Sequence, residues 1–174
     1  MLKIKYLAVA ASLLAVSSAY AADAQINFTG EIQSNTCDIT NAAGGNVNVI
    51  LPNISASNFS TGTEKAGQTA FDIILENCTD NTPVAVRFVG TSNQIDTASG
   101  LFKNISTEQP ALNVGVAVYD STGTLIKAAG NSSAQVNITA GTATIPLTAY
   151  YQATAPGVTA GKVAATGGIE LVYN

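Results

Sequence analysis

Apolar and polar residues alternate along most of this chain with a period of two. In residues 25–33, one side holds Ile26, Phe28, Gly30 and Ile32, and the polar residues between them fall on the other side. Successive side chains of a β-strand point to opposite faces, so this alternation predicts a strand with one buried face. The same pattern recurs in Val47, Val49, Leu51; Phe71, Ile73, Leu75; Val84, Val86, Phe88; Val114, Val116, Val118; Val136, Ile138; Ile145, Leu147, Ala149, Tyr151; and Val163, Ala165, Gly167, Ile169, Leu171, Tyr173.

The spacing of these segments predicts the fold class. Turn residues separate the segments at positions 120–123, 129–131 and 155–157, and no stretch of a dozen residues carries a helical stripe. We therefore expect an all-β sandwich with one core of about seven or eight strands. Residues 55–67 and 91–100 resemble linkers, but the strands on either side are too few to close two cores, which favours a single domain.

The first residues have the features of an export signal. Lys3 and Lys5 precede an apolar run over residues 6–16, and small residues close the segment with an A-x-A pattern at 19–21. This predicts a signal peptide at 1–21 that is cleaved after Ala21. The run is shorter than the roughly 20 residues that span a bilayer, so a retained anchor is the weaker interpretation. Cleavage removes both lysines and leaves an exported chain more acidic than the full sequence, whose net charge is −4.

Cys37 and Cys78 are the two cysteines of the chain. An exported protein leaves the reducing cytosol, so a structural disulfide is the expected state of this pair. A reactive thiol or a metal pair is the alternative, but two sulfurs without a histidine make a poor closed zinc site.

Composition excludes several function classes. The chain has no histidine, which removes the usual catalytic triads and zinc motifs, and its acidic balance gives no basic footprint for nucleic acid. No other arrangement of side chains suggests a catalytic, cofactor or metal site. We therefore expect no enzyme activity, no cofactor and no small-molecule substrate.

The alternating segment at 25–33 precedes the first cysteine. Nothing covalent fixes it to the body with which it would pair, so it can pair within its own chain or with another molecule. The residues alone leave both possibilities open.

The chain resembles a structural pilin of the chaperone–usher class, similar to type 1 fimbrial major subunits. The resemblance covers nearly the whole chain after the signal peptide. It depends on the order and spacing of these pieces: residues 28–32 (FTGEI) before Cys37, 71–78 (FDIILENC), 84–90 (VAVRFVG), 114–120 (VGVAVYD) with Gly123, 149–153 (AYYQA), and 158–163 (VTAGKV) through to the penultimate Tyr173.

The resemblance implies an immunoglobulin-like sandwich that lacks its last strand. In the family, a periplasmic chaperone first fills the resulting groove, and the N-terminal extension of the next subunit then replaces it at an outer-membrane usher. Carried over to this chain, residues 22–33 would be the donor-strand extension and 34–174 the pilin domain. Ile26, Phe28 and Ile32 would enter the groove of a neighbour, and Gly30 would fit where a side chain would clash.

The resemblance also implies roles at the C-terminus. Ile169, Leu171 and Tyr173 would border the groove, with Tyr173 in contact with the chaperone, and Cys37 and Cys78 would form the family's disulfide. The expected function is a fimbrial subunit that polymerises by donor-strand exchange into adhesive surface filaments, exported through the periplasm. A minor or adaptor fimbrial subunit and a secreted carbohydrate-binding β-sandwich stay open as alternatives, the latter with Tyr150 and Tyr151 as a stacking surface.

Overall fold

Short and long β-strands make up the regular structure of residues 37–173, the part of the chain that the computed structural model describes. A single turn of 3-10 helix accompanies them there. The elements are β1 (Asp38–Ile39), η1 (Ala56–Asn58), β2 (Lys65–Glu76), β3 (Pro83–Val89), β4 (Ile95–Asp96), β5 (Leu101–Lys103), β6 (Val114–Asp120), β7 (Val136–Asn137), β8 (Ala143–Ala153) and β9 (Gly168–Tyr173).

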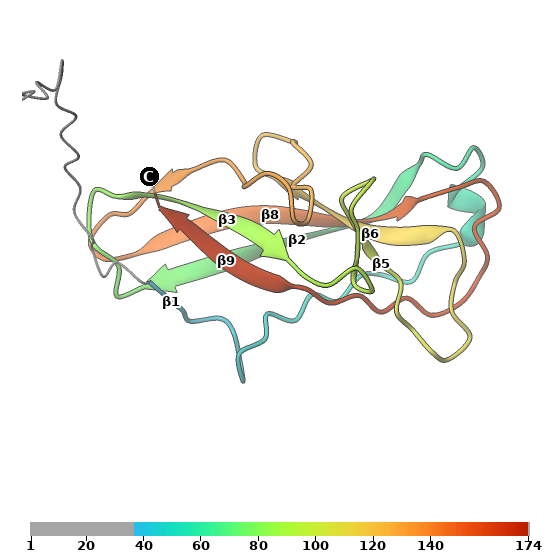
Figure 1. Cartoon of the computed structure of the whole chain (residues 1–174), viewed down its shortest axis with the longest axis horizontal. Coiled ribbons are helices and arrows are strands. Elements are labelled where there is room, and N and C mark those ends of the chain that lie inside the picture. The colour runs from blue at the N-terminus through green and yellow to red at the C-terminus, as the bar shows by residue number, and fades with distance from the viewer. Residues whose placement is uncertain (1–36, 174) are drawn as a thin grey trace, which may run out of the picture. The chain divides into compact units, whose positions relative to one another are not determined.

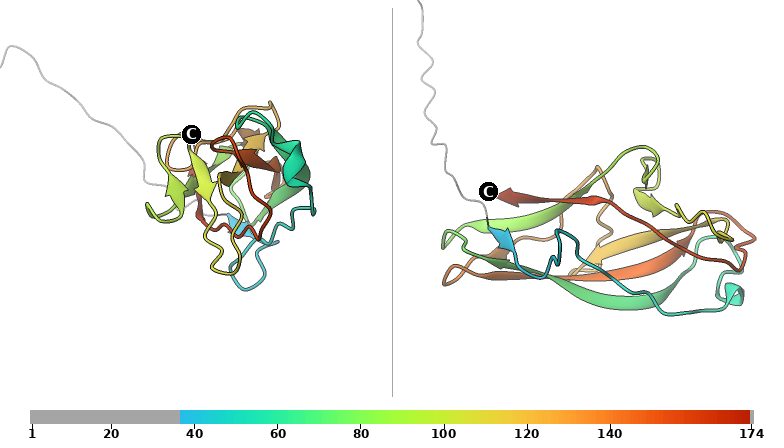
Figure 2. Two further views of the ribbon diagram at one scale, coloured as in Figure 1. Left: turned by 90° about the vertical axis from the view of Figure 1, so that its right-hand side faces the viewer. Right: turned by 90° about the horizontal axis from the view of Figure 1, so that it is seen from below.

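The strands form two sheets that lie face to face (Figure 1; Figure 2, right). The larger sheet has the order β1-β2-β8-β6-β5-β4, and the smaller sheet has the order β7-β3-β9. Every pairing is antiparallel. The prediction of an all-β sandwich is confirmed.

The core lies between the sheets and contains the apolar face that the alternation predicts. In the pairing of β2 with β8, Ile73 lies opposite Ile145 and Phe71 opposite Leu147, so both strands direct these residues to the same side. Val84 and Val86 of β3 meet them from the smaller sheet and are completely buried. Burial of such side chains is the main favourable contribution to folding.

The observed strands differ from the predicted strands where the presence or absence of a pairing partner determines whether a strand forms. Residues 91–100 are not a linker, because β4 forms there and pairs with β5. Residues 55–67 contain η1 and the start of β2. Residues 47–51 form no strand, and the strand predicted from Val163 begins only at Gly168.

Residues 1–36 lie outside the described part of the chain. The predicted signal peptide at 1–21 and the predicted donor residues Ile26, Phe28, Gly30 and Ile32 therefore stay predictions. Within residues 37–173, no helix has the length and hydropathy of a membrane span.

Candidate functional site: an open groove beside β9

Strand β9 forms one edge of the smaller sheet. It pairs with β3 along its whole length, from Val84 opposite Tyr173 to Val89 opposite Gly168. No strand among residues 37–173 pairs with its other edge. The backbone groups on that side are therefore open to an additional strand.

Residues 47–54 lie beside the same opening and are also unpaired. Their backbone N–H and C=O groups make no hydrogen bond to any other residue that the structure describes. An unpaired buried backbone group costs as much as a lost hydrogen bond, so a folded chain normally pairs such groups or leaves them in water. Two unpaired segments thus approach one space from opposite sides.

The side chains of these two segments are apolar on the side that faces the core. Each is half-buried and packs against the buried cluster. They are Val47, Val49 and Leu51 from one segment and Ile169, Leu171 and Tyr173 from β9. The alternate residue Ile50 is 87% exposed. The side chains of residues 47–51 therefore alternate between half-buried and exposed, as the period of two predicts, although no strand forms.

A groove of about 840 Å³ opens beside residues 49–56, beyond the Gly168 end of β9 and away from Tyr173, and no residue of β9 lines it. Residues 49–56 form one wall, and residues 158–165 form the other. Val114 and Val116 of β6 and Tyr151 of β8 contribute to its floor. These floor side chains are apolar or aromatic, whereas the walls are partly polar, so an apolar side chain that enters the groove would be buried against its floor.

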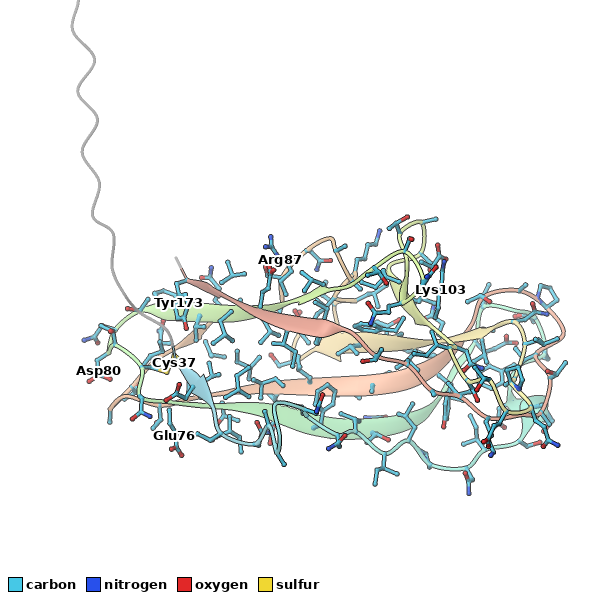
Figure 3. The ribbon with its side chains drawn as sticks, turned by 60° about the horizontal axis from the view of Figure 1, so that its bottom comes forward. Cys37, Glu76, Asp80, Arg87, Lys103 and Tyr173 are labelled. Atoms are coloured by element: carbon cyan, nitrogen blue, oxygen red, sulfur yellow. A yellow bond between two sulfur atoms is a disulfide. The ribbon has the colours of Figure 1, made fainter. Side chains whose placement is uncertain are left out.

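The other end of the opening is held by contacts around Cys37. Cys37 forms a disulfide with Cys78, which joins the residue before β1 to the second residue after the end of β2. The predicted disulfide is confirmed. The Cys37 backbone N–H also donates a hydrogen bond of 2.8 Å to the Tyr173 hydroxyl. Figure 3 shows Cys37 and Tyr173 at the same end of the described residues.

The three residues predicted at the groove edge, Ile169, Leu171 and Tyr173, lie together on the open strand β9, but none of them lines the 840 Å³ groove, so their role at its edge stays a prediction. It adds walls that the sequence did not assign to the site, residues 49–56 and 158–165. The alternation at 47–51 was a signal for the first wall. The second wall overlaps the predicted C-terminal strand only at residues 163–165, and no sequence signal marked its separate role.

The two tyrosines considered as a sugar-stacking surface face opposite sides of the larger sheet. Tyr151 lines the groove, whereas Tyr150 packs edge-to-face on Tyr119 with ring centroids 5.5 Å apart. The Lys65 ammonium lies 4.0 Å from the Tyr119 ring centroid and 4.7 Å from that of Tyr150. Tyr150 and Tyr151 therefore form no common platform.

Neither the Tyr119 hydroxyl nor the Tyr151 hydroxyl is ionised. Burial raises the pKa of the Tyr151 hydroxyl and, together with the neighbouring Tyr150, that of the Tyr119 hydroxyl, so both stay uncharged at neutral pH. Among the described residues, no three His, Cys, Asp or Glu side chains gather as metal ligands would.

Comparisons with known proteins agree with this geometry. The family model described as "Fimbrial protein" matches residues 26–174. The major fimbrial subunit SMF-1 of Stenotrophomonas maltophilia (strain K279a) is 34% identical over 165 residues, which cover 90% of this chain and 96% of the relative. The type-1 fimbrial protein A chain of Escherichia coli (strain K12) is 31% identical, covering 88% of this chain and 90% of the relative.

A solved structure of a chaperone–usher pilus has a similar fold. It superimposes with a TM-score of 0.62 at 17% identity, over 88% of this chain and 96% of that one. The sandwich is accordingly the immunoglobulin-like fold of chaperone–usher pilins. The family match spans most of the chain and includes the disulfide, the groove walls and β9. This chain therefore belongs to the fimbrial protein family.

Proposed function

We propose that this structural pilus subunit, exported to the cell surface as part of a fimbria, polymerises by donor-strand exchange. In this proposal, the groove beside β9 receives residues 22–33 of the next subunit. The observation that carries the proposal is the pair of unpaired backbone edges, at β9 and at residues 47–54, whose half-buried apolar side chains pack against the same core cluster.

The donor segment of this chain has the matching pattern. Ile26, Phe28 and Ile32 fall on one side of the predicted strand, with Gly30 between them. Burial of three large apolar side chains contributes roughly 4.5 to 9 kcal/mol at about 1.5 to 3 kcal/mol each. A ladder of backbone hydrogen bonds along the open edge adds to this, as in other cases of strand addition.

We also propose that a periplasmic chaperone occupies the groove before assembly and that an outer-membrane usher directs the exchange. An open edge above exposed apolar side chains is prone to aggregation, so an unassembled subunit needs a temporary strand. Ile169, Leu171 and Tyr173 lie on the edge that such a strand would meet. The proposed role is purely structural and uses no catalytic residue.

Two changes to the donor segment test the proposal. Replacing Gly30 by Leu places a large side chain on the face that enters the groove, so we expect slower polymerisation. Thr29→Leu is the matched control, because it adds similar apolar bulk on the opposite face of the same strand. The measurement is the rate at which SDS-resistant oligomers form from purified full-length subunits. Equal rates for Gly30→Leu and Thr29→Leu would contradict the proposal.

Deletion of residues 22–32 is a second test. The shortened subunit should still copurify with chaperone, because its groove is intact, but it should add no strand to a neighbour. Normal filaments from this deletion would show that residues 22–32 are not the donor.

A further inference from the structure

The wall at residues 158–165 is held by one loop, residues 104–112. None of residues 158–165 belongs to a named strand. Gly161 fits closely against the loop, since an added Cβ there would lie 2.4 Å from the Ala111 nitrogen. The hydrogen bonds between wall and loop backbones are Ala111 N–H to Lys162 O (3.0 Å), Lys162 N–H to Gln109 O (2.8 Å), Ile105 N–H to Ala164 O (2.8 Å) and Thr159 N–H to Leu112 O (3.3 Å).

The side chain of Asn104 joins the wall and the loop in addition to these bonds. Its amide nitrogen donates to the carbonyl oxygens of Ala111 and Lys162, both at 2.9 Å. Its amide oxygen accepts from the backbone N–H of Ser106 at 3.1 Å and of Ala164 at 3.0 Å. Two donated and two accepted bonds use the full capacity of an asparagine side chain.

This arrangement decides which backbone groups of the wall face away from the loop. Lys162 and Ala164 direct both their N–H and their C=O to the loop or to Asn104. Val163 and Ala165 alternate with them and make no backbone hydrogen bond within residues 37–173. A period of two is that of a strand with one edge paired and the other edge free.

We propose that Asn104 is a positioning residue of the groove. Its side chain fixes Lys162 and Ala164, so that the free backbone groups of Val163 and Ala165 stand ready to bond with one end of an incoming strand. The inference rests on the proposed function, because it assigns Asn104 to the same groove. Asn104 itself need not touch the incoming strand.

The substitution Asn104→Asp separates this role from simple packing. Aspartate has nearly the same shape, but it places a carboxylate oxygen against the carbonyl oxygens of Ala111 and Lys162. The matched control is Asn131→Asp. Asn131 also donates to two carbonyl oxygens and accepts one backbone N–H, in a loop that does not line the groove.

The assay is binding of synthetic peptides to the full chain at a concentration at which it is monomeric. The peptides are residues 22–33 and versions shortened from either end, and fluorescence anisotropy gives each dissociation constant. We expect Asn104→Asp to weaken the full peptide about tenfold, the effect of one or two lost hydrogen bonds. The loss should disappear for peptides shortened from one end and persist for those shortened from the other. Asn131→Asp should bind all of them as the unsubstituted chain does.

Each outcome decides the inference. An equal loss of affinity for every peptide would indicate that the whole groove has loosened. Unchanged affinity for every peptide would show that Asn104 does not position the groove. Either result overturns the inference while the proposed function stands. Failure of the unsubstituted chain to bind any peptide would overturn both.

A second variant and a second measurement guard against misfolding of Asn104→Asp. Asn104→Ala removes the same bonds without adding charge and should show the same dependence on peptide end. Hydrogen exchange should become faster in residues 158–165 of either variant and stay unchanged in β2. Unchanged exchange in residues 158–165 would also overturn the inference.

Discussion

Replacing Asp120 by Asn should destabilise the sandwich far more than its conservative shape suggests. Asp120 ends β6, and the residue is only 7% exposed. Its Oδ1 accepts from the Thr122 N–H (2.9 Å), the Thr122 hydroxyl (2.6 Å) and the Thr124 N–H (3.0 Å). Its Oδ2 accepts from the Ala134 N–H (2.8 Å). One carboxylate thus joins the turn after β6 to the segment that leads into β7.

The magnitude follows from this geometry. Asparagine offers one oxygen, so its amide nitrogen must face a group that itself donates. If the oxygen keeps Thr122 and Thr124, the nitrogen meets the Ala134 N–H. A hydrogen bond to a charged group contributes about 1.5 to 3 kcal/mol, and an unsatisfied buried donor costs about 1 to 3 kcal/mol. We expect the free energy of unfolding to fall by about 3 kcal/mol and Tm by roughly 6 to 12 °C.

The same carboxylate should make the effect depend on pH. Burial raises the pKa of Asp120, but the hydrogen bonds from Thr122, Thr124 and Ala134 together outweigh it and hold the pKa below its ordinary value of 3.8. A carboxyl whose pKa is lower in the folded state stabilises the fold above its unfolded pKa. That contribution is lost as the pH falls through the folded pKa. The stability difference between the unsubstituted chain and Asp120→Asn should therefore shrink below about pH 4.

Urea unfolding of full-length subunits at neutral and at acid pH measures both effects. Asp72→Asn is the control, because it removes a carboxylate from an exposed position on β2 and should change stability by less than about 0.5 kcal/mol. Asp96, whose pKa the Ser99 hydrogen bond lowers, contributes the same acid sensitivity to every variant. Equal stability of Asp120→Asn and Asp72→Asn, or a difference that does not shrink in acid, would refute the reasoning.

Three other substitutions test the ends of the groove. Replacing Cys37 and Cys78 together by Ala opens a loop of sequence separation 41 and should lower the free energy of unfolding by about 4 kcal/mol, measured in guanidinium without reductant. Tyr173→Phe keeps the ring but loses the bond to the Cys37 amide, which should cost about 1 kcal/mol and speed exchange of that amide. Gly161→Ala places a methyl 2.4 Å from the Ala111 nitrogen and should lower Tm by an amount equivalent to about 1 to 3 kcal/mol. For each of these three variants, an unfolding curve identical to that of the unsubstituted chain would contradict the prediction.

The sequence predicts the long strands because the alternation of apolar and polar residues along them indicates which face is buried. Strands β2, β3, β6 and β8 each carry an alternating apolar face, and each packs that face into the core. The same reasoning cannot detect short strands. Strand β4 has two residues, too few to display a period, and exists because β5 lies beside it.

Periodicity says which side of a segment is buried but not whether its backbone has a partner. Residues 47–51 alternate as clearly as β2, yet no strand within residues 37–173 supplies hydrogen bonds to them. Val163 continues the pattern of β9, but the backbone of residues 162 and 164 bonds to a loop. Asn104 had no sequence signal, because its partners lie as far as 60 residues along the chain. The open groove becomes visible only when backbone pairing is known.

Contacts at the two ends of the groove, rather than side chains inside it, keep its walls apart. At one end, the Tyr173 hydroxyl and the disulfide fix Cys37, the first described residue, beside the end of β9. At the other end, Asn104 and the loop that it organises fix the second wall. An incoming strand then meets edges that are already ordered, so less of its binding free energy is lost in ordering the acceptor. Because core residues such as Ile73 and Val86 are already fully buried, strand addition can proceed without repacking the deep core.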